Sequence, residues 1–231
     1  MDPVHYIFTR WSVYLNGIAE WRIVNDVQDT STVIDALFNE TRLSKKFEFF
    51  EKMTYLSIKN QTYTNYVWYI FTSSLLPQKY KDKLEVLSSP NIIIVYVTPT
   101  ENLSRITSDL VKDKTLYTTL NIDDDDGLAP GFLLRLNSYM SQTGKVITFP
   151  RGTLYTIENG NLVFGGKHVY RNINLGLTAI EFNVFKAGNH YTVDERYEVI
   201  VDDTPDMYWV CCSEVCDTKR KFSMVETVKK R

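Results

Sequence analysis

The chain passes from a β-prone run into four adjacent aspartates in the sequence Thr118-Thr119-Leu120-Asn121-Ile122-Asp123-Asp124-Asp125-Asp126-Gly127-Leu128. Adjacent carboxylates repel one another, and each loses hydration when it is even partly buried. One interpretation of the run is a solvated acidic turn. The other is a strand end where carboxylate oxygens bind Mg²⁺, Mn²⁺ or Ca²⁺. The apolar segments on both sides favour the strand end.

Upstream of the aspartates, strand-like and helix-like segments alternate about four times. Ile92–Val97 has the strongest strand pattern, because it is β-branched or aromatic and uncharged, and we expect it to be a central strand buried on both faces. Such alternation predicts an α/β fold, a three-layer α/β/α sandwich around a mostly parallel central sheet. Strands are expected at residues 4–8, 67–71, 92–97 and 115–122, and helices at 42–59, 77–87, 103–111 and after Pro130.

The pattern changes after residue 145. The segment Leu154–Phe164 contains two β-prone runs around Asn159-Gly160, which is a strong hairpin signal. We interpret this half as a C-terminal antiparallel extension of the same domain. The sequence therefore predicts a single domain over residues 1–231, made of an α/β half at 1–140, a β-rich half at 141–217 and a basic tail at 218–231.

The composition and charge of the chain limit the classes of function that can be expected. The 26 basic and 28 acidic side chains give a net charge of −2, so no global attraction to nucleic acid or to an anionic membrane is expected. Three cysteines without CxxC spacing argue against a disulfide framework and a zinc site. No apolar run approaches the ~18–20 residues of a transmembrane helix, and the N-terminus lacks the features of a signal peptide. We expect a soluble, cytoplasmic protein.

Several well-known site motifs are missing from the sequence. It contains no Gly-x-Gly-x-x-Gly, no Walker Gly-x-x-x-x-Gly-Lys and no Gly-x-Ser-x-Gly. Its three histidines form no His-x-x-x-His pair. The main chemical candidate is therefore the carboxylate group at a strand end.

Two segments resemble GT-A glycosyltransferases. Gln61-Thr62-Tyr63-Thr64-Asn65, at the end of a helix and before a strand, is similar to the segment that precedes their second strand. Asn121–Leu128 resembles their metal-binding DXD region. With His5–Trp11 at the start, the chain is most similar to the rhamnosyltransferase group, over roughly residues 4–140. The resemblance implies a GT-A-like fold whose first half binds a nucleotide sugar and whose second half binds a glycan or glycoconjugate acceptor.

The resemblance also implies a divalent-metal cofactor, Mn²⁺ or Mg²⁺. In a strand-like register Asp123 and Asp125 point to the same side, so we predict that they bind the metal, with Asp126 as the next ligand. Asp124 is expected to face the ribose or the solvent. Asp123 and Asp124 are thus also predicted to contact the donor, a UDP- or dTDP-linked sugar.

Further donor and acceptor residues follow from positions at the carboxyl edge of the expected sheet, as for Arg10, and from the same resemblance. Thr9, Arg10 and Arg105 are predicted donor contacts, and Ser73 lies where many relatives have an aspartate for the nucleotide base. An inverting transfer needs a general base, for which Asp194 is chosen ahead of Glu195, Asp202 and Asp203. The late histidine of the group is missing, and Glu214 could replace it.

Two other functions remain open at this point. A sugar-phosphate nucleotidyltransferase would also use a divalent metal, but Thr9-Arg10-Trp11-Ser12 is not the glycine-rich loop usual in that class. A non-catalytic carbohydrate-binding protein on a transferase fold would need no metal chemistry. We expect an enzyme, a metal-dependent glycosyltransferase that moves a sugar, with rhamnose as the sugar that the resemblance suggests.

Overall fold

The computed structural model describes residues 2–16, 30–158 and 161–212 of the chain. Its centre is a seven-stranded sheet in the order β10-β6-β9-β4-β1-β2-β3. Strand β9 is antiparallel to its neighbours β4 and β6, and the other neighbouring strands pair in parallel. The strands are β1 (Val4–Trp11), β2 (Tyr66–Ser73), β3 (Ile92–Val97), β4 (Tyr117–Asn121), β6 (Val146–Thr148), β9 (Thr178–Ile180) and β10 (Val199–Val201).

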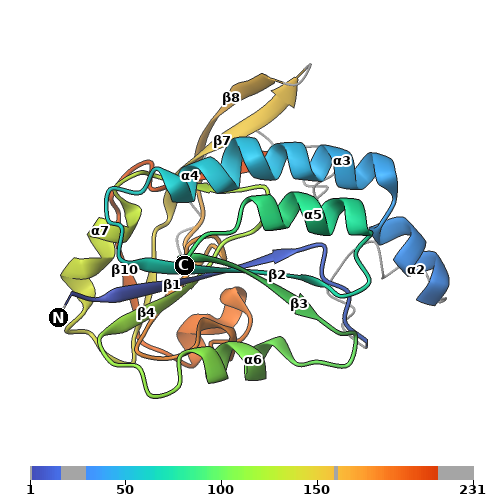
Figure 1. The fold of residues 1–231 in the computed structure, drawn as a ribbon. Helices are drawn as coiled ribbons and strands as arrows, with labels where there is room; N and C mark the ends of the chain where they lie inside the picture. Colours follow the sequence, from blue (N-terminus) through green and yellow to red (C-terminus); the bar gives the residue numbers. More distant parts are fainter. Residues whose placement is uncertain (1, 17–29, 159–160, 213–231) are drawn as a thin grey trace.

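Helices cover both faces of this sheet, as the alternating pattern predicted (Figure 1). One apolar core, which includes Trp11, Phe50 and Trp68, lies under α3, α4 and α5, and a second, which includes Phe8 and Phe71, lies under α6. The three-layer arrangement is confirmed. The helices are α2 (Thr30–Leu37), α3 (Glu40–Phe49), the π-helix η1 (Phe50–Tyr55), α4 (Leu56–Lys59), α5 (Gln78–Val86), α6 (Leu103–Leu110), α7 (Phe132–Leu136), and the 3₁₀ turns η2 (Asn137–Tyr139), η3 (Val184–Lys186) and η4 (His190–Glu195).

A second, four-stranded sheet is built from the C-terminal half, in the order β5-β11-β7-β8. Strands β7 (Arg151–Glu158) and β8 (Asn161–Val169) form the predicted antiparallel hairpin, which projects from the body in Figure 1. The turn residues Asn159 and Gly160 lie outside the described residues. Strand β11 (Tyr208–Cys212) pairs with β7 and with β5 (Gly127–Leu128), so this sheet meets the segment that directly follows the aspartates.

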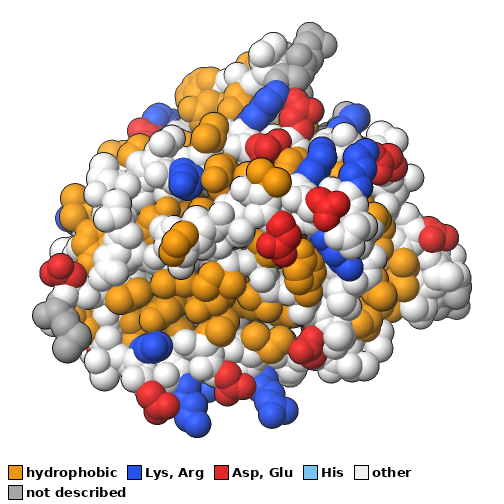
Figure 2. Space-filling model, viewed as in Figure 1, with side chains coloured by type: hydrophobic (Ala, Val, Ile, Leu, Met, Phe, Trp, Pro, Cys, Tyr) orange, Lys and Arg blue, Asp and Glu red, His pale blue; other side chains and the backbone are white. Residues whose placement is uncertain are grey.

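The prediction that Ile92–Val97 is a central strand is wrong. As β3 it is the last strand of the large sheet and pairs with β2. Ile93 is 37% exposed, and Figure 2 shows an apolar band on this side of the molecule, between α5 and α6. A β-branched run indicates that a segment is a strand, but not whether the strand pairs with one neighbouring strand or with two.

The Gln-x-Tyr-x-Asn segment acts as a structural clamp in this fold. Gln61 Nε2 donates to the carbonyl oxygens of Ser57 at 3.0 Å and Ala129 at 2.8 Å, and Gln61 Oε1 accepts from the Leu133 amide. Tyr63 and Asn65 both donate to the Pro3 carbonyl. The segment therefore joins the end of α4 to the start of β1 and to the chain that follows the aspartates.

None of the helices within the described residues combines the length and the apolar character needed to cross a membrane.

Candidate functional site

The four aspartates, here called the acidic loop (Asp123–Asp126), follow β4 after one residue, Ile122. Strand β4 lies beside β1, and the Ile122 amide continues the pairing by donating to the Phe8 carbonyl at 3.0 Å. The loop therefore leaves the sheet at the carboxyl end of β4, as predicted. Asp124 and Asp126 are buried, whereas Asp123 and Asp125 are half-buried. The alternation leaves Asp123 and Asp125 as the more accessible carboxylates.

Asp124 forms a buried ion pair with Lys46 of α3. The distance from Lys46 Nζ to Asp124 Oδ1 is 2.7 Å, and the two side chains are 7% and 5% exposed. Because a buried carboxylate is costly without a cation, the pair explains why Asp124 can turn inward. The expectation that Asp124 faces the solvent is wrong, and the alternative of a ribose contact stays a prediction.

Asp126 is also buried, and no lysine or arginine in the described part of the chain forms an ion pair with it. Its Oδ1 accepts a hydrogen bond from the Cys211 amide of β11 at 3.1 Å. Burial raises the pKa of the Asp126 carboxyl well above its usual range, and the nearby charges of Asp125 and Asp123 raise it further. The Cys211 amide lowers this pKa, but not enough to offset the other effects. The surroundings of Asp126 therefore disfavour its charged form.

The backbone of the acidic loop is held from two further sides. Thr54 of η1 donates its hydroxyl proton to the Asp126 carbonyl at 2.7 Å. On the other side Gly127 packs between β11 and η1, where a Cβ atom at this residue would lie 2.8 Å from Trp209 Cε3 and 3.2 Å from Met53 Sδ. Only glycine allows this approach. Helix α3, the π-helix η1 and strand β11 thus fix the loop together.

This carboxylate arrangement fits a divalent cation that binds together with a diphosphate. The described residues contain no group of three or more His, Cys, Asp or Glu side chains arranged to hold a metal by themselves. Ions on nucleotide substrates keep phosphate and water ligands, so one or two protein carboxylates suffice. Asp123 and Asp125 can supply these. Metal binding by Asp123, Asp125 and Asp126 stays a prediction.

Three neighbouring parallel strands end in buried polar atoms near the loop. Trp11 Nε1 at the end of β1, Thr72 Oγ1 near the end of β2 and Asn121 Oδ1 at the end of β4 have no hydrogen-bond partner among the described residues. Such atoms are rare in folded proteins and call for an explanation. Their common position marks the carboxyl edge of the sheet, where α/β proteins bind ligands.

The predicted donor contacts lie on both faces of the sheet. Thr9 is buried within β1 and its hydroxyl accepts from Trp68 Nε1 at 3.0 Å, so it supports the core. Arg10 is half-buried, with its guanidinium 6.0 Å from the centre of the Phe185 ring. Ser73 ends β2, and its hydroxyl accepts from the Leu75 amide. Arg105 is exposed on α6, on the face of the sheet opposite α3.

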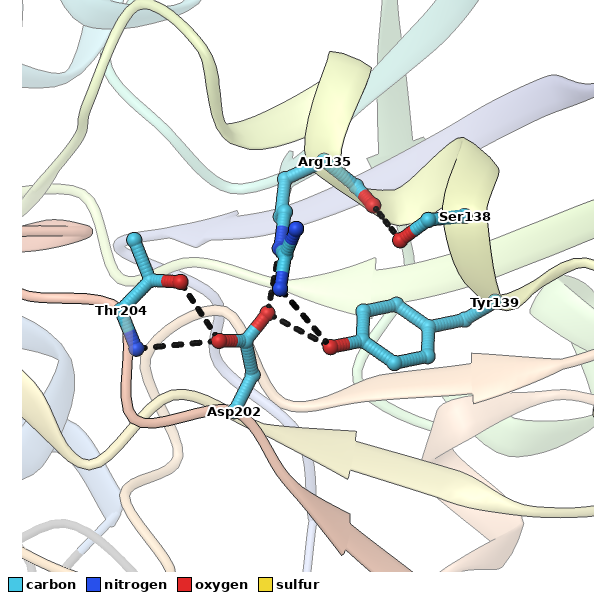
Figure 3. A network of polar contacts seen from close by, with 5 residues as sticks. All are labelled: Arg135, Ser138, Tyr139, Asp202 and Thr204. Atoms are coloured by element: carbon cyan, nitrogen blue, oxygen red, sulfur yellow. Dashed lines mark hydrogen bonds and ion pairs between the residues drawn. The ribbon is translucent and has the colours of Figure 1, made fainter.

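The acceptor-side carboxylates differ in how they are engaged. Asp194, the predicted base, is exposed in η4, and Asp203 is exposed beside Arg151. Asp202 is buried and accepts from Arg135 Nε at 2.6 Å, the Tyr139 hydroxyl at 2.7 Å, and the Thr204 amide and hydroxyl at 3.0 and 2.6 Å (Figure 3). Glu214 lies outside the described residues.

The pKa of Asp202 reflects this network. Burial would raise the pKa of its carboxyl, but the hydrogen bonds from Arg135, Thr204 and Tyr139 outweigh burial and lower the pKa to about 2. A carboxylate so stabilised is a weak proton acceptor at neutral pH. Asp202 is therefore a structural residue rather than a general base.

Sequence reasoning missed Lys46, Thr54 and the Cys211 amide. A signal existed for Lys46, because it lies three residues after Leu43 and four before Phe50, on the apolar stripe of the predicted helix. A lysine in that position is buried unless the helix turns away. The backbone donor of Cys211 gives no side-chain signal.

Comparison with known families decides where the chain belongs. The family described as "Putative rhamnosyl transferase" matches residues 7–222. The chain belongs to this family. No curated protein matches it.

Solved structures of S. aureus TarS share the fold of this rhamnosyl transferase family member. TarS 1–349 in complex with UDP-GlcNAc aligns with a TM-score of 0.52 and 9% identity, covering 91% of this chain and 58% of TarS 1–349. Another structure of TarS 1–349 aligns with a TM-score of 0.52 and 8% identity, covering 91% of this chain and 60% of that one. The chain thus spans less than two thirds of these TarS chains. At this identity the likeness shows the fold, and the predicted GT-A-like architecture is confirmed.

Proposed function

We propose that this protein is a glycosyltransferase that moves a sugar from a nucleotide-sugar donor to a glycan or glycoconjugate acceptor. The observation that carries the proposal is the acidic loop at the carboxyl end of β4, in a chain of the rhamnosyl transferase family. The family description supports rhamnose as the sugar. The complex of TarS with UDP-GlcNAc supports UDP as the nucleotide, with dTDP as the second choice.

Asp123 and Asp125 are the proposed ligands of a divalent ion, Mn²⁺ or Mg²⁺, because they are the accessible pair of the loop. When bound, such an ion acts as a Lewis acid that stabilises the charge growing on the diphosphate leaving group. Asp126 stays the next proposed ligand, on the buried side of the loop, where its Oδ1 accepts from the Cys211 amide. Lys46 neutralises Asp124, so Asp124 contributes little to the net charge of the loop.

The remaining roles are assigned from position. Arg10, at the end of β1, is proposed to contact the diphosphate, and Ser73, at the end of β2, the nucleoside. Asp194 is proposed as the general base of an inverting transfer, because its exposed position is open to an acceptor. Thr9 supports the site through Trp68, and Arg105 is proposed as a long-range electrostatic contribution to donor binding.

Calorimetry with UDP, with and without Mn²⁺, tests the proposal. We expect the wild-type protein to bind UDP at least tenfold more tightly with Mn²⁺ than without it. Asp125→Asn should remove most of this gain while leaving the melting temperature unchanged or raised. Asp203→Asn is the matched control, because this exposed carboxylate pairs with Arg151 outside the acidic loop, and it should bind as the wild type does.

Other outcomes separate the alternatives. Binding of UDP that does not depend on the metal would contradict the metal part of the proposal alone. If neither UDP nor dTDP binds with Mn²⁺ or Mg²⁺, the result would favour a non-catalytic carbohydrate-binding protein. Release of pyrophosphate from a nucleoside triphosphate and a sugar phosphate would identify a nucleotidyltransferase. A panel of nucleotide sugars, followed by the release of free nucleoside diphosphate, would then identify the donor.

A further inference from the structure

We infer that Lys46 and Thr54 are positioning residues for the acidic loop, which they hold in the register that presents Asp123 and Asp125 to the donor. This inference rests on the proposed function. Both residues lie on the continuous helical segment α3–η1–α4, and neither belongs to the loop itself. They contact it at two different points, Lys46 at the Asp124 carboxylate and Thr54 at the Asp126 carbonyl.

The contact with Lys46 determines that Asp124, and not a neighbouring aspartate, points into the protein. A lysine and an aspartate that are both buried stabilise each other only at close range, and here Nζ and Oδ1 are 2.7 Å apart. The two residues are 78 positions apart in the chain. If the loop slipped by one residue, Asp123 or Asp125 would take the inward position and the pair would be lost. Lys46 therefore fixes which aspartates point inward.

The π-helix η1 explains how one helical face reaches the loop twice. Lys46 and Thr54 are eight residues apart, which in a regular α-helix places them ~80° apart around the axis, since each residue turns ~100°. A π turn takes about one residue more than an α turn, so one α turn and one π turn together contain roughly eight residues. The insertion brings Lys46 and Thr54 onto the same face.

The two inward contacts set the direction of the other two aspartates. The loop is a turn rather than a continued strand, with the Asp126 amide donating to the Asp123 carbonyl at 3.4 Å. Within this turn the Asp124 side chain points to Lys46 and the Asp126 side chain accepts from the Cys211 amide, while Asp123 and Asp125 are half-buried. Partner groups that orient metal ligands typically change metal affinity 10- to 100-fold when they are removed. Lys46 and Thr54 are partner groups of this kind for the proposed ligands Asp123 and Asp125.

The test compares Lys46→Met with Lys52→Met in the binding of UDP in the presence of Mn²⁺. Lys52 is the matched control, because it pairs with Glu48 on the same helical segment but is 55% exposed. We expect Lys46→Met to bind about tenfold more weakly or worse, with faster amide exchange at residues 123–126, and Lys52→Met to match the wild type. Wild-type affinity and exchange in Lys46→Met would overturn the inference.

A double variant separates positioning from stability. Lys46→Met leaves Asp124 buried without its cation, whereas Lys46→Met combined with Asp124→Leu replaces the pair by apolar side chains, which often restores stability. We expect the double variant to regain the melting temperature but not the affinity for UDP with Mn²⁺. Recovery of both would mean that Lys46 only stabilises the fold, and would overturn the inference.

Thr54→Val provides a test that does not involve a buried charge, because valine keeps the shape and removes only the hydroxyl. We expect affinity for UDP with Mn²⁺ to fall about threefold or more, and wild-type affinity here would contradict the role of Thr54. A wild-type protein that binds no UDP with any metal would overturn the proposed function and this inference with it. Normal binding by the wild type, Lys46→Met and Thr54→Val would overturn the inference alone.

Discussion

Asp126 and Asp202 are both buried carboxylates, at 8% and 5% exposure, yet their surroundings are opposite. Asp202 accepts hydrogen bonds from Arg135, Tyr139 and Thr204, and its pKa is lowered to about 2. Asp126 accepts one from the Cys211 amide, lies beside other aspartates, and has a raised pKa. Burial by itself would raise the pKa of both. The difference comes from the number of donors and the sign of the neighbouring charges.

This difference distinguishes a structural carboxylate from a functional one. The Asp202 network (Asp202, Arg135, Tyr139 and Thr204; Figure 3) joins the chain after β10 to α7 and η2, and its charges are balanced within the fold. The acidic loop is held by contacts from α3, η1 and β11, but four carboxylates lie side by side in it, and the charges of Asp125 and Asp123 help to raise the pKa of Asp126. Strongly perturbed carboxylates of the second kind concentrate at functional sites. A cation would relieve the repulsion that the fold retains in the loop.

Asp202→Asn is expected to have the largest effect on stability. It removes the charge that pairs with Arg135 and weakens four hydrogen bonds, and we expect it to lower the free energy of unfolding by about 2–3 kcal/mol at pH 7. Urea denaturation measures this change. Binding of UDP with Mn²⁺ should remain within twofold of the wild type. A donor-binding defect without a loss of stability would contradict the structural role of Asp202.

The pH dependence of the free energy of unfolding should also show the contribution of Asp202. Because the folded-state pKa of Asp202 is lowered from 3.8 to about 2, its contribution is complete above pH 4 and is lost as the pH falls through about 2. The wild type should therefore lose roughly 2 kcal/mol over this range from Asp202. Urea midpoints at pH 5, 4 and 3 for the wild type and Asp202→Asn should converge as the pH falls. Parallel curves would contradict the assignment.

Asp126→Asn is expected to change stability in the opposite direction. The amide oxygen of asparagine can still accept from the Cys211 amide, while the repulsion from Asp123 and Asp125 disappears. We expect the free energy of unfolding at pH 7 to rise by about 1 kcal/mol. If Asp126→Asn lowered the free energy of unfolding as much as Asp202→Asn does, the proposed difference between the two carboxylates would be contradicted. Thermal and urea denaturation of both variants in the same buffer provide the comparison.

The parts of the fold that sequence could predict were those with local causes. The strand that runs into the acidic loop, the helices and the β7–β8 hairpin all follow from hydrophobic period and turn residues. The edge position of Ile92–Val97 was missed, because its local pattern is the same for an edge and a central strand. Family resemblance pointed to the Gln-x-Tyr-x-Asn segment, but its clamping role through Gln61 becomes visible only in three dimensions.

The site was predictable to a similar degree. The acidic run and its place at a strand end were visible in the sequence, since four adjacent carboxylates are conspicuous. The inward turn of Asp124 depends on Lys46, 78 positions away, and the network of Asp202 depends on Arg135, 67 positions away. Such distant pairs leave little trace in a single sequence. The π turn in η1, which aligns Lys46 with Thr54, gave no signal that sequence reasoning could use.

The central claim is that the acidic loop binds a divalent ion together with the nucleotide. Mn²⁺ uptake, followed by the loss of the free-ion signal in electron paramagnetic resonance, tests it directly. In the presence of UDP we predict that the wild type and Asp202→Asn take up Mn²⁺, that uptake is much weaker without UDP, and that Asp123→Asn combined with Asp125→Asn abolishes it. Equal uptake by the wild type and the double variant would contradict the claim.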